Sequence, residues 1–105
     1  MAEKRRQSRK KRRFLIQVET SGSVSTGFTY DMSFEGIFIR SVRIPPPGST
    51  VTARLSLPDG KRLALRGTVQ RAYRAPGAMS GVVPSGFSLL LTDAPADYSH
   101  FLASL

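Results

Sequence analysis

Apolar and polar residues alternate over several short stretches of the chain, which is the pattern of half-buried β-strands. The first stretch begins at Phe14, where the apolar residues at 14, 16 and 18 share one side. The same reasoning predicts five further strands, over residues 24–30, 37–39, 51–57, 63–69 and 87–91. Strands that are this short and this closely spaced favour an all-β fold.

Turn residues separate the predicted strands. Ser21-Gly22-Ser23, the prolines 45–47 with Gly48, and Pro58-Asp59-Gly60 each match a turn. Residues 31–36 are expected to form a short connecting loop, and a longer loop is expected over 74–85. After Pro95, residues 96–105 predict one or two helical turns. The whole is a six-stranded antiparallel β-barrel, closed or nearly closed, with a short C-terminal helix.

The positive charge of the chain is unevenly distributed. The chain has 105 residues, enough for one core, and a formal net charge of +9. Residues 1–13 hold eight Lys or Arg against the single acidic residue Glu3, and the remainder is nearly neutral. We therefore expect two parts, a basic flexible arm over 1–13 and a single barrel domain over 14–105. An anionic partner would be attracted mainly to the arm.

Several function classes are disfavoured by composition. The chain has no Cys and one His, His100, so neither a metal site nor a cofactor is expected. No arrangement of Ser, His and Asp or of paired carboxylates suggests a catalytic site, and we predict that the protein is not an enzyme. No apolar run approaches the ~20 residues of a membrane span, and no signal peptide is recognisable. A cytoplasmic protein is expected.

The arm contains two overlapping RxxxR arrangements, Arg5 with Arg9 and Arg9 with Arg13. Residues four apart lie on the same side of an extended or helical chain, so either pair can aim two guanidinium groups at one ligand. Arginine suits phosphates because its planar fork bonds two oxygens, and its face stacks on aromatic rings. Taken alone, the basic run favours a solvated tail or a non-specific contact with nucleic acid.

A second motif, DxSxxG, consists of Asp31, Ser33 and Gly36 and lies between two predicted strands. Asp31 can accept two hydrogen bonds, which matches the adjacent N–H donors of a guanine edge, and Ser33 adds a hydroxyl. Gly36 permits a positive φ or a close approach of the backbone. The alternative is a capped turn in which Asp31 and Ser33 bond only to nearby backbone, and this motif alone favours that alternative.

The two motifs in combination resemble the PilZ domain. The resemblance is carried by EKRRQSR at residues 3–9 and DMSFEGIFI at 31–39, and more loosely by Pro47-Gly48, RGTV at 66–69 and Gly86-Phe87. It implies a six-stranded barrel with a C-terminal helix that binds the bacterial second messenger cyclic di-GMP between the arm and the barrel face. The ordered arm would then signal to a downstream protein partner, with motility and biofilm formation among the outputs expected for the family.

Carried over by motif position, Arg5 and Arg9 would hold phosphates and guanine faces, with Arg6 and Arg13 as alternatives. In the second motif, Asp31 and Ser33 would hold a guanine edge and Gly36 would shape the loop.

Two other functions stay open. One is a nucleic-acid-binding small β-barrel, although Phe38 and Phe87 are expected in the core and not in an exposed stacking row. The other is a PilZ-like protein-interaction adaptor that needs no ligand.

Overall fold

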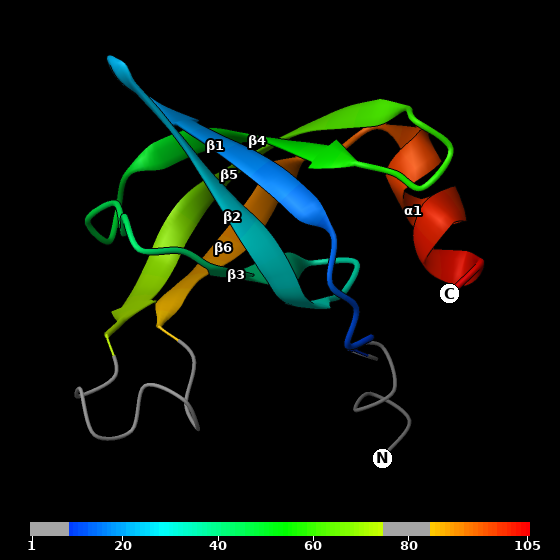
Figure 1. Ribbon diagram of the computed structural model, residues 1–105, viewed down its shortest axis with the longest axis horizontal. Helices are drawn as coiled ribbons and strands as arrows, with labels where there is room; N and C mark the ends of the chain where they lie inside the picture. The colour runs from blue at the N-terminus through cyan, green and yellow to red at the C-terminus, as the bar shows by residue number, and fades with distance from the viewer. Residues whose placement is uncertain (1–8, 75–84) are drawn as a thin grey trace.

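The computed structural model describes residues 9–74 and 85–105, which form a closed barrel of antiparallel strands and one helix (Figure 1). The order around the barrel is β1-β2-β3-β6-β5-β4. The elements are β1 (Leu15–Thr20), β2 (Ser23–Met32), β3 (Gly36–Arg40), β4 (Thr50–Ser56), β5 (Arg62–Tyr73), β6 (Gly86–Asp93) and α1 (Ala96–Ala103). The predicted fold class is therefore confirmed, down to the six strands and the short C-terminal helix.

The core consists of the side chains that alternate inward along each strand. In β4, for example, Val51, Ala53 and Leu55 are almost completely buried, while the residues between them reach the surface. Helix α1 contributes Tyr98 and Leu102 to the same core. The other buried apolar residues of this cluster are Ile16, Val18, Met32, Ile37, Ile39, Leu63, Leu65, Val69, Phe87 and Leu89.

Strand β2 is longer than the sequence predicts. It continues through Asp31 to Met32, so the expected loop over 31–36 was too long and comprises only residues 33–35. The physical reason is a β-bulge. Thr29 pairs with Ile39 and Asp31 pairs with Phe38, which leaves Tyr30 as an extra residue in the ladder. The bulge re-aims the end of β2 and buries Met32.

The other boundaries differ less. Strand β5 extends to Tyr73 past a register shift between Val69 and Arg71. Of the predicted loop over 74–85, all but Arg74 and Ser85 lies outside the described residues. Helix α1 ends at Ala103, two residues earlier than predicted.

The described end of the N-terminal arm runs along β2. Lys10 and Met32 exchange two backbone hydrogen bonds, at 2.8 and 2.9 Å. Thr29 adds three more, because its N–H donates to Phe14 O, its hydroxyl donates to Arg12 O, and its Oγ1 accepts from Phe14 N. Phe14 then packs edge-on against Phe101 of α1. Mobility of the arm in the absence of ligand stays a prediction.

Candidate functional site

Arg9 joins the two motifs that the sequence singles out. Its Nε donates to Asp31 Oδ1 at 2.9 Å, its Nη2 donates to the same oxygen, and its Nη1 donates to Ser33 Oγ at 3.2 Å. One arginine of the arm thus holds the acidic and the hydroxyl residue of DxSxxG together. Arg5 and Arg6 lie outside the described residues.

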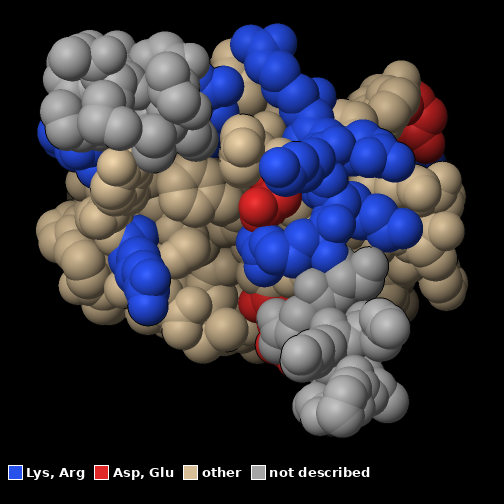
Figure 2. All heavy atoms as spheres, turned by 90° about the horizontal axis from the view of Figure 1, so that it is seen from below, with Lys and Arg blue, Asp and Glu red and all other residues tan. Residues whose placement is uncertain are grey.

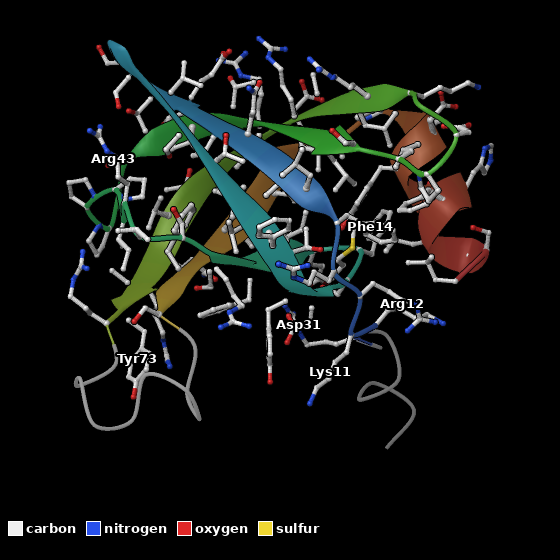
Figure 3. The ribbon with its side chains drawn as sticks, in the orientation of Figure 1. Lys11, Arg12, Phe14, Asp31, Arg43 and Tyr73 are labelled. Atoms are coloured by element: carbon white, nitrogen blue, oxygen red, sulfur yellow. The ribbon has the colours of Figure 1, made fainter. Side chains whose placement is uncertain are left out.

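Asp31 owes its position to the β2 bulge. The bulge places Asp31 opposite Phe38 of β3, on the outer face of the barrel, and Figure 3 shows its side chain below β2 near the arm residue Lys11. The Asp31 side chain is 18% exposed and that of Arg9 is 40% exposed. The ion pair is therefore open to solvent from the side of Arg9.

Ser33 is buried and shapes the loop. Its N–H and its hydroxyl both donate to Gly36 O, at 2.8 and 3.2 Å, and its Oγ accepts from Gly36 N at 3.1 Å. These bonds close the turn over residues 33–36, as a capped turn would. Unlike a purely local cap, Ser33 also accepts from Arg9. Direct contact between Ser33 and a ligand stays a prediction.

Gly36 is needed where β3 passes close to β6. A Cβ at this position would lie 2.7 Å from the backbone oxygen of Leu89, which is closer than real Cβ contacts. Its φ lies outside the left-handed region, so of the two reasons given for a glycine here, the close approach is the one that applies.

Tyr98 connects helix α1 to the same loop. Its hydroxyl donates to Ser33 O at 2.8 Å, and the side chain is fully buried. Burial raises the pKa of Tyr98 well above its usual value, while the nearby positive charge of Arg9 acts in the opposite direction. Sequence reasoning missed this residue. The available signal was a tyrosine in the predicted helix, since a buried Tyr hydroxyl usually finds a hydrogen-bond partner.

Phe38 belongs to the surface beside Asp31, so its expected place in the core was wrong. Ile37 and Ile39 take the buried positions of β3, and the alternation of a strand then turns Phe38 outward. Its ring meets the ring of Tyr30 edge-on, with centroids 6.0 Å apart. Phe87, by contrast, is fully buried as expected.

A hollow of about 710 Å³ opens on this outer face, a size typical of small-molecule sites. The strand registers explain its composition, because Phe38 pairs with Ser88 of β6, and Ser88 pairs with Arg71 of β5. The lining residues are Arg9, Asp31, Phe38, Gln70, Arg71, Ala72, Tyr73 and Ser88. Tyr73, labelled in Figure 3, is 41% exposed and was also missed by sequence reasoning. The exposed ring of Tyr73, the partly buried ring of Phe38 and two arginines thus surround one carboxylate.

Basic side chains gather around this site. Figure 2 shows Lys and Arg clustered on the face from which the arm emerges. Two of the arm cations contact aromatic rings of β2, because Arg13 lies 3.9 Å from the ring centroid of Phe28 and Lys11 lies 5.6 Å from that of Tyr30. The arrangement favours an anionic ligand that also carries ring surfaces.

Two further structural properties limit the chemistry of the described residues. Their His, Cys, Asp and Glu side chains do not form a group of three or more that could hold a metal ion. The helix that is described is too short and too polar to cross a membrane.

Comparisons with known proteins agree with the family resemblance found in the sequence. The model of the PilZ domain matches residues 3–100. Among solved structures, the chain is similar to the inhibitor of motility MotI/DgrA of Bacillus subtilis, with a TM-score of 0.77 and 15% sequence identity. The match covers 95% of this chain and 48% of that protein, so this chain spans about half its length. At this identity the likeness establishes the fold alone. No curated protein matches the chain.

Proposed function

This chain belongs to the PilZ domain family, and from that premise we propose that it is a receptor for cyclic di-GMP that passes the signal to a protein partner. PilZ domains are binding and adaptor modules and not enzymes. The observation that carries the proposal is the contact of Arg9 with both Asp31 and Ser33 on an open face of the barrel.

Ligand binding at this site would be an exchange of partners. In the free protein Arg9 donates to one carboxylate oxygen of Asp31. A phosphate of cyclic di-GMP would replace Asp31 as the acceptor for Arg9, and the N–H donors of a guanine would replace Arg9 at Asp31. Each charged group keeps a charged or strongly polar partner, so neither is left unpaired by the exchange.

Neighbouring rings would bind the bases. Phe38 and Tyr73 line the hollow that contains Arg9 and Asp31. Stacking of a base on an aromatic side chain contributes about 1–3 kcal/mol, so these two rings are suitable platforms for guanine. Gly36 supports the site indirectly, because it lets β3 carry the loop close against β6.

The position of Arg13 favours Arg5 over Arg13 as the partner of Arg9. Arg13 lies over Phe28 and lines a different hollow, which shares none of its lining residues with the hollow of Arg9. Arg9 would therefore act with Arg5, or with Arg6 as the alternative, and not with Arg13.

The output would be an ordering of the arm. Residues 1–13 hold eight basic side chains, which repel one another in the free protein. The ligand's phosphates would reduce that repulsion and hold the arm more firmly than its contacts with β2 do alone, creating a new surface for the partner. We expect the receptor to act in the cytoplasm. Motility is the first physiological output that we would test. Unchanged arm dynamics in NMR relaxation measurements on the ligand-saturated protein would contradict this mechanism.

The receptor hypothesis is tested by calorimetric titration with cyclic di-GMP, with GTP as competitor. Arg9→Ala should weaken binding roughly 10–100-fold, because a hydrogen bond to a charged group contributes about 1.5–3 kcal/mol. Arg54→Ala is the matched control, since Arg54 also pairs with a carboxylate but on other strands of the barrel. Absence of binding by the parent, or an equal loss in both variants, would exclude the site proposed.

A further inference from the structure

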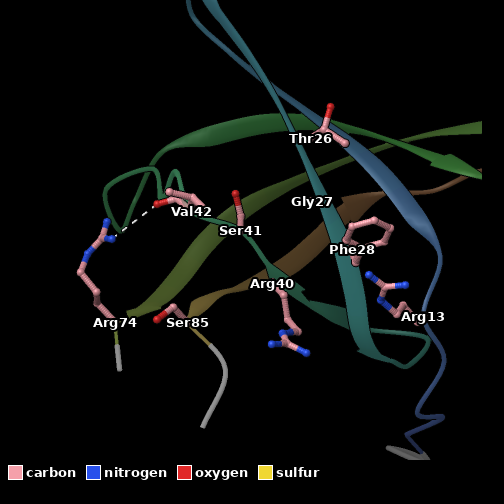
Figure 4. A pocket seen from close by; sticks show the side chains of 9 residues that line it. All are labelled: Arg13, Thr26, Gly27, Phe28, Arg40, Ser41, Val42, Arg74 and Ser85. Atoms are coloured by element: carbon pink, nitrogen blue, oxygen red, sulfur yellow. Dashed lines mark hydrogen bonds between the residues drawn. The ribbon is translucent and has the colours of Figure 1, made fainter. Parts of the chain in front are cut away.

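A second hollow, of about 500 Å³, lies between the arm and strands β2 and β3 (Figure 4). Arg13, Arg40 and Arg74 line it, together with Gly27 and Phe28. It shares no lining residue with the hollow of Arg9 and Asp31. It also explains the position of Arg13, the arm arginine for which the cyclic di-GMP site described above has no use.

The positive charge of the three arginines is not balanced by an acidic residue among the described residues that line this hollow. The three arginines come from three segments, namely the arm, the last residue of β3 and the residue after β5. The described residues that line it include neither Asp nor Glu. Three guanidinium groups around one space repel one another, and a bound anion would relieve that repulsion.

Arg13 and Arg40 are positioned to act together. Phe28, over whose ring Arg13 lies, is paired with Arg40 in the β2–β3 ladder. The contact with the ring occupies no oxygen acceptor, so the N–H groups of Arg13 can still donate to a ligand. Gly27 also lines the hollow, and a Cβ there would lie 2.4 Å from Arg40 O, so the absence of a side chain lets β2 and β3 approach closely at this point.

Arg74 approaches from the opposite side. Its Nη1 donates to Val42 O at 3.5 Å, the long end of the hydrogen-bond range. That contact uses one N–H group of Arg74 and leaves its other N–H groups for a ligand. Figure 4 shows Arg74 on the far side of the hollow from Arg13, with Arg40 between them.

We propose that this hollow is a second anion site that binds a phosphodiester group, with Arg13 and Arg40 as the main donors and Arg74 as the third. A phosphodiester offers two non-bridging oxygens, each able to accept from more than one guanidinium fork, so neighbouring arginines can share it. The phosphodiester can come from a cyclic dinucleotide or from a linear oligonucleotide. The site does not depend on binding at Arg9 and Asp31.

Backbone amide NMR signals can test both sites in one titration. Uniformly labelled protein is titrated separately with cyclic di-GMP and with a short single-stranded RNA. The amides of Gly27 and Ser41 report on the second hollow, and those of Asp31 and Gly36 report on the proposed receptor site. We expect the Gly27 and Ser41 signals to shift with at least one probe, and the probe that acts at lower concentration identifies the source of the phosphodiester.

Variants separate the two sites. The double variant R13Q and R40Q keeps a polar side chain at each position but removes two charges, and it should weaken the Gly27 and Ser41 response by at least about tenfold. Arg62→Gln, at an exposed arginine that begins β5, is the matched control and should leave the response unchanged. The spread of the amide signals verifies folding of every variant.

Two results would overturn the second site. One is the absence of Gly27 and Ser41 shifts with either probe, and the other is their survival in the double variant. If Gly27 and Ser41 respond while Asp31 and Gly36 do not respond to cyclic di-GMP, the receptor proposal fails and the second site stands.

Discussion

Two arginine–carboxylate ion pairs of the barrel differ in their hydrogen bonds and in the segments that supply them. Arg54 of β4 donates to both carboxylate oxygens of Glu19 of β1, at 3.2 and 3.0 Å. Both side chains are about one-third exposed. Arg9 instead donates twice to a single oxygen of Asp31 and once to Ser33, and it extends from the arm and not from a strand of the barrel.

The difference lies in what surrounds each pair. Glu19 and Arg54 occupy neighbouring strands whose ladder fixes their separation, and each satisfies the other. The second carboxylate oxygen of Asp31 accepts no hydrogen bond from Arg9. Ser33, which accepts from Arg9, also accepts from the hydroxyl of Tyr98 in α1. Under the proposed function a ligand would exchange with the Arg9 pair, whereas the Arg54 pair links two neighbouring strands.

Removing the charge of Asp31 should have the largest effect. Asp31→Asn keeps the size of the side chain but replaces one acceptor oxygen with a donor, which opposes the N–H groups of a guanine. Affinity for cyclic di-GMP should fall roughly 10–100-fold, since hydrogen bonds to charged groups contribute about 1.5–3 kcal/mol. Calorimetry measures this loss. Glu19→Gln makes the same chemical change in the other pair and should bind as the parent does; an equal loss there would remove the distinction between the pairs.

The link from the Arg9 pair to the helix should contribute to stability. Tyr98→Phe removes the donor to Ser33 O and leaves that carbonyl without this bond. The free energy of unfolding should fall by about 1–3 kcal/mol, and each kcal/mol lowers Tm by about 4–8 °C in a domain near this size. Urea denaturation followed by circular dichroism gives the value. Tyr30→Phe, at a partly exposed tyrosine, should change stability much less, and a comparable loss in both variants would argue against a special role for the Tyr98 hydroxyl.

The same tyrosine should make stability sensitive to alkaline pH. Its pKa is raised in the folded protein, so the neutral hydroxyl is favoured there relative to the unfolded chain. This contribution is fully present below the unfolded value of about 10 and is lost as the pH rises above it. The parent should therefore lose more stability than Tyr98→Phe between pH 9 and about pH 11. Parallel stability profiles for the two proteins in urea titrations would show that Tyr98 ionises freely.

The smallest effect is expected for the Arg54 pair itself. Exposed ion pairs contribute about 0.2–1 kcal/mol, and salt screens them. Arg54→Ala should thus lower the free energy of unfolding by less than about 1 kcal/mol at low ionic strength, and by less again in 0.5 M NaCl. A loss well above this range would mean that the pair is a structural element comparable to the contact of Tyr98 with the loop.

Sequence and structure agree best where one local signal is sufficient. The alternation at 51–57 and the turn at Pro58-Asp59-Gly60 depend on neighbouring residues only, and both match the observed β4–β5 hairpin. The motifs likewise named Arg9, Asp31 and Ser33, which the fold brings together.

The misses involve information from distant parts of the chain. Ile37, Phe38 and Ile39 are all apolar, so alternation could not assign the face of Phe38 without its neighbours in β2 and β6. The bulge at Tyr30 depends on the partner strand, and it decides where β2 ends. Tyr98 finds its acceptor 65 residues earlier in the chain. Such contacts arise only from the assembled barrel.

The closure of the barrel also determines how other molecules can recognise it. Every strand that the structure describes pairs with a neighbour on each side over part of its length. Residues 23–27 of β2 and 62–65 of β5 pair on one side only, so β-augmentation, a common mode of peptide recognition, is confined to such short stretches. Over the rest of the barrel partners must recognise side chains, and specificity can change by substitution at outward positions while the backbone scaffold remains intact.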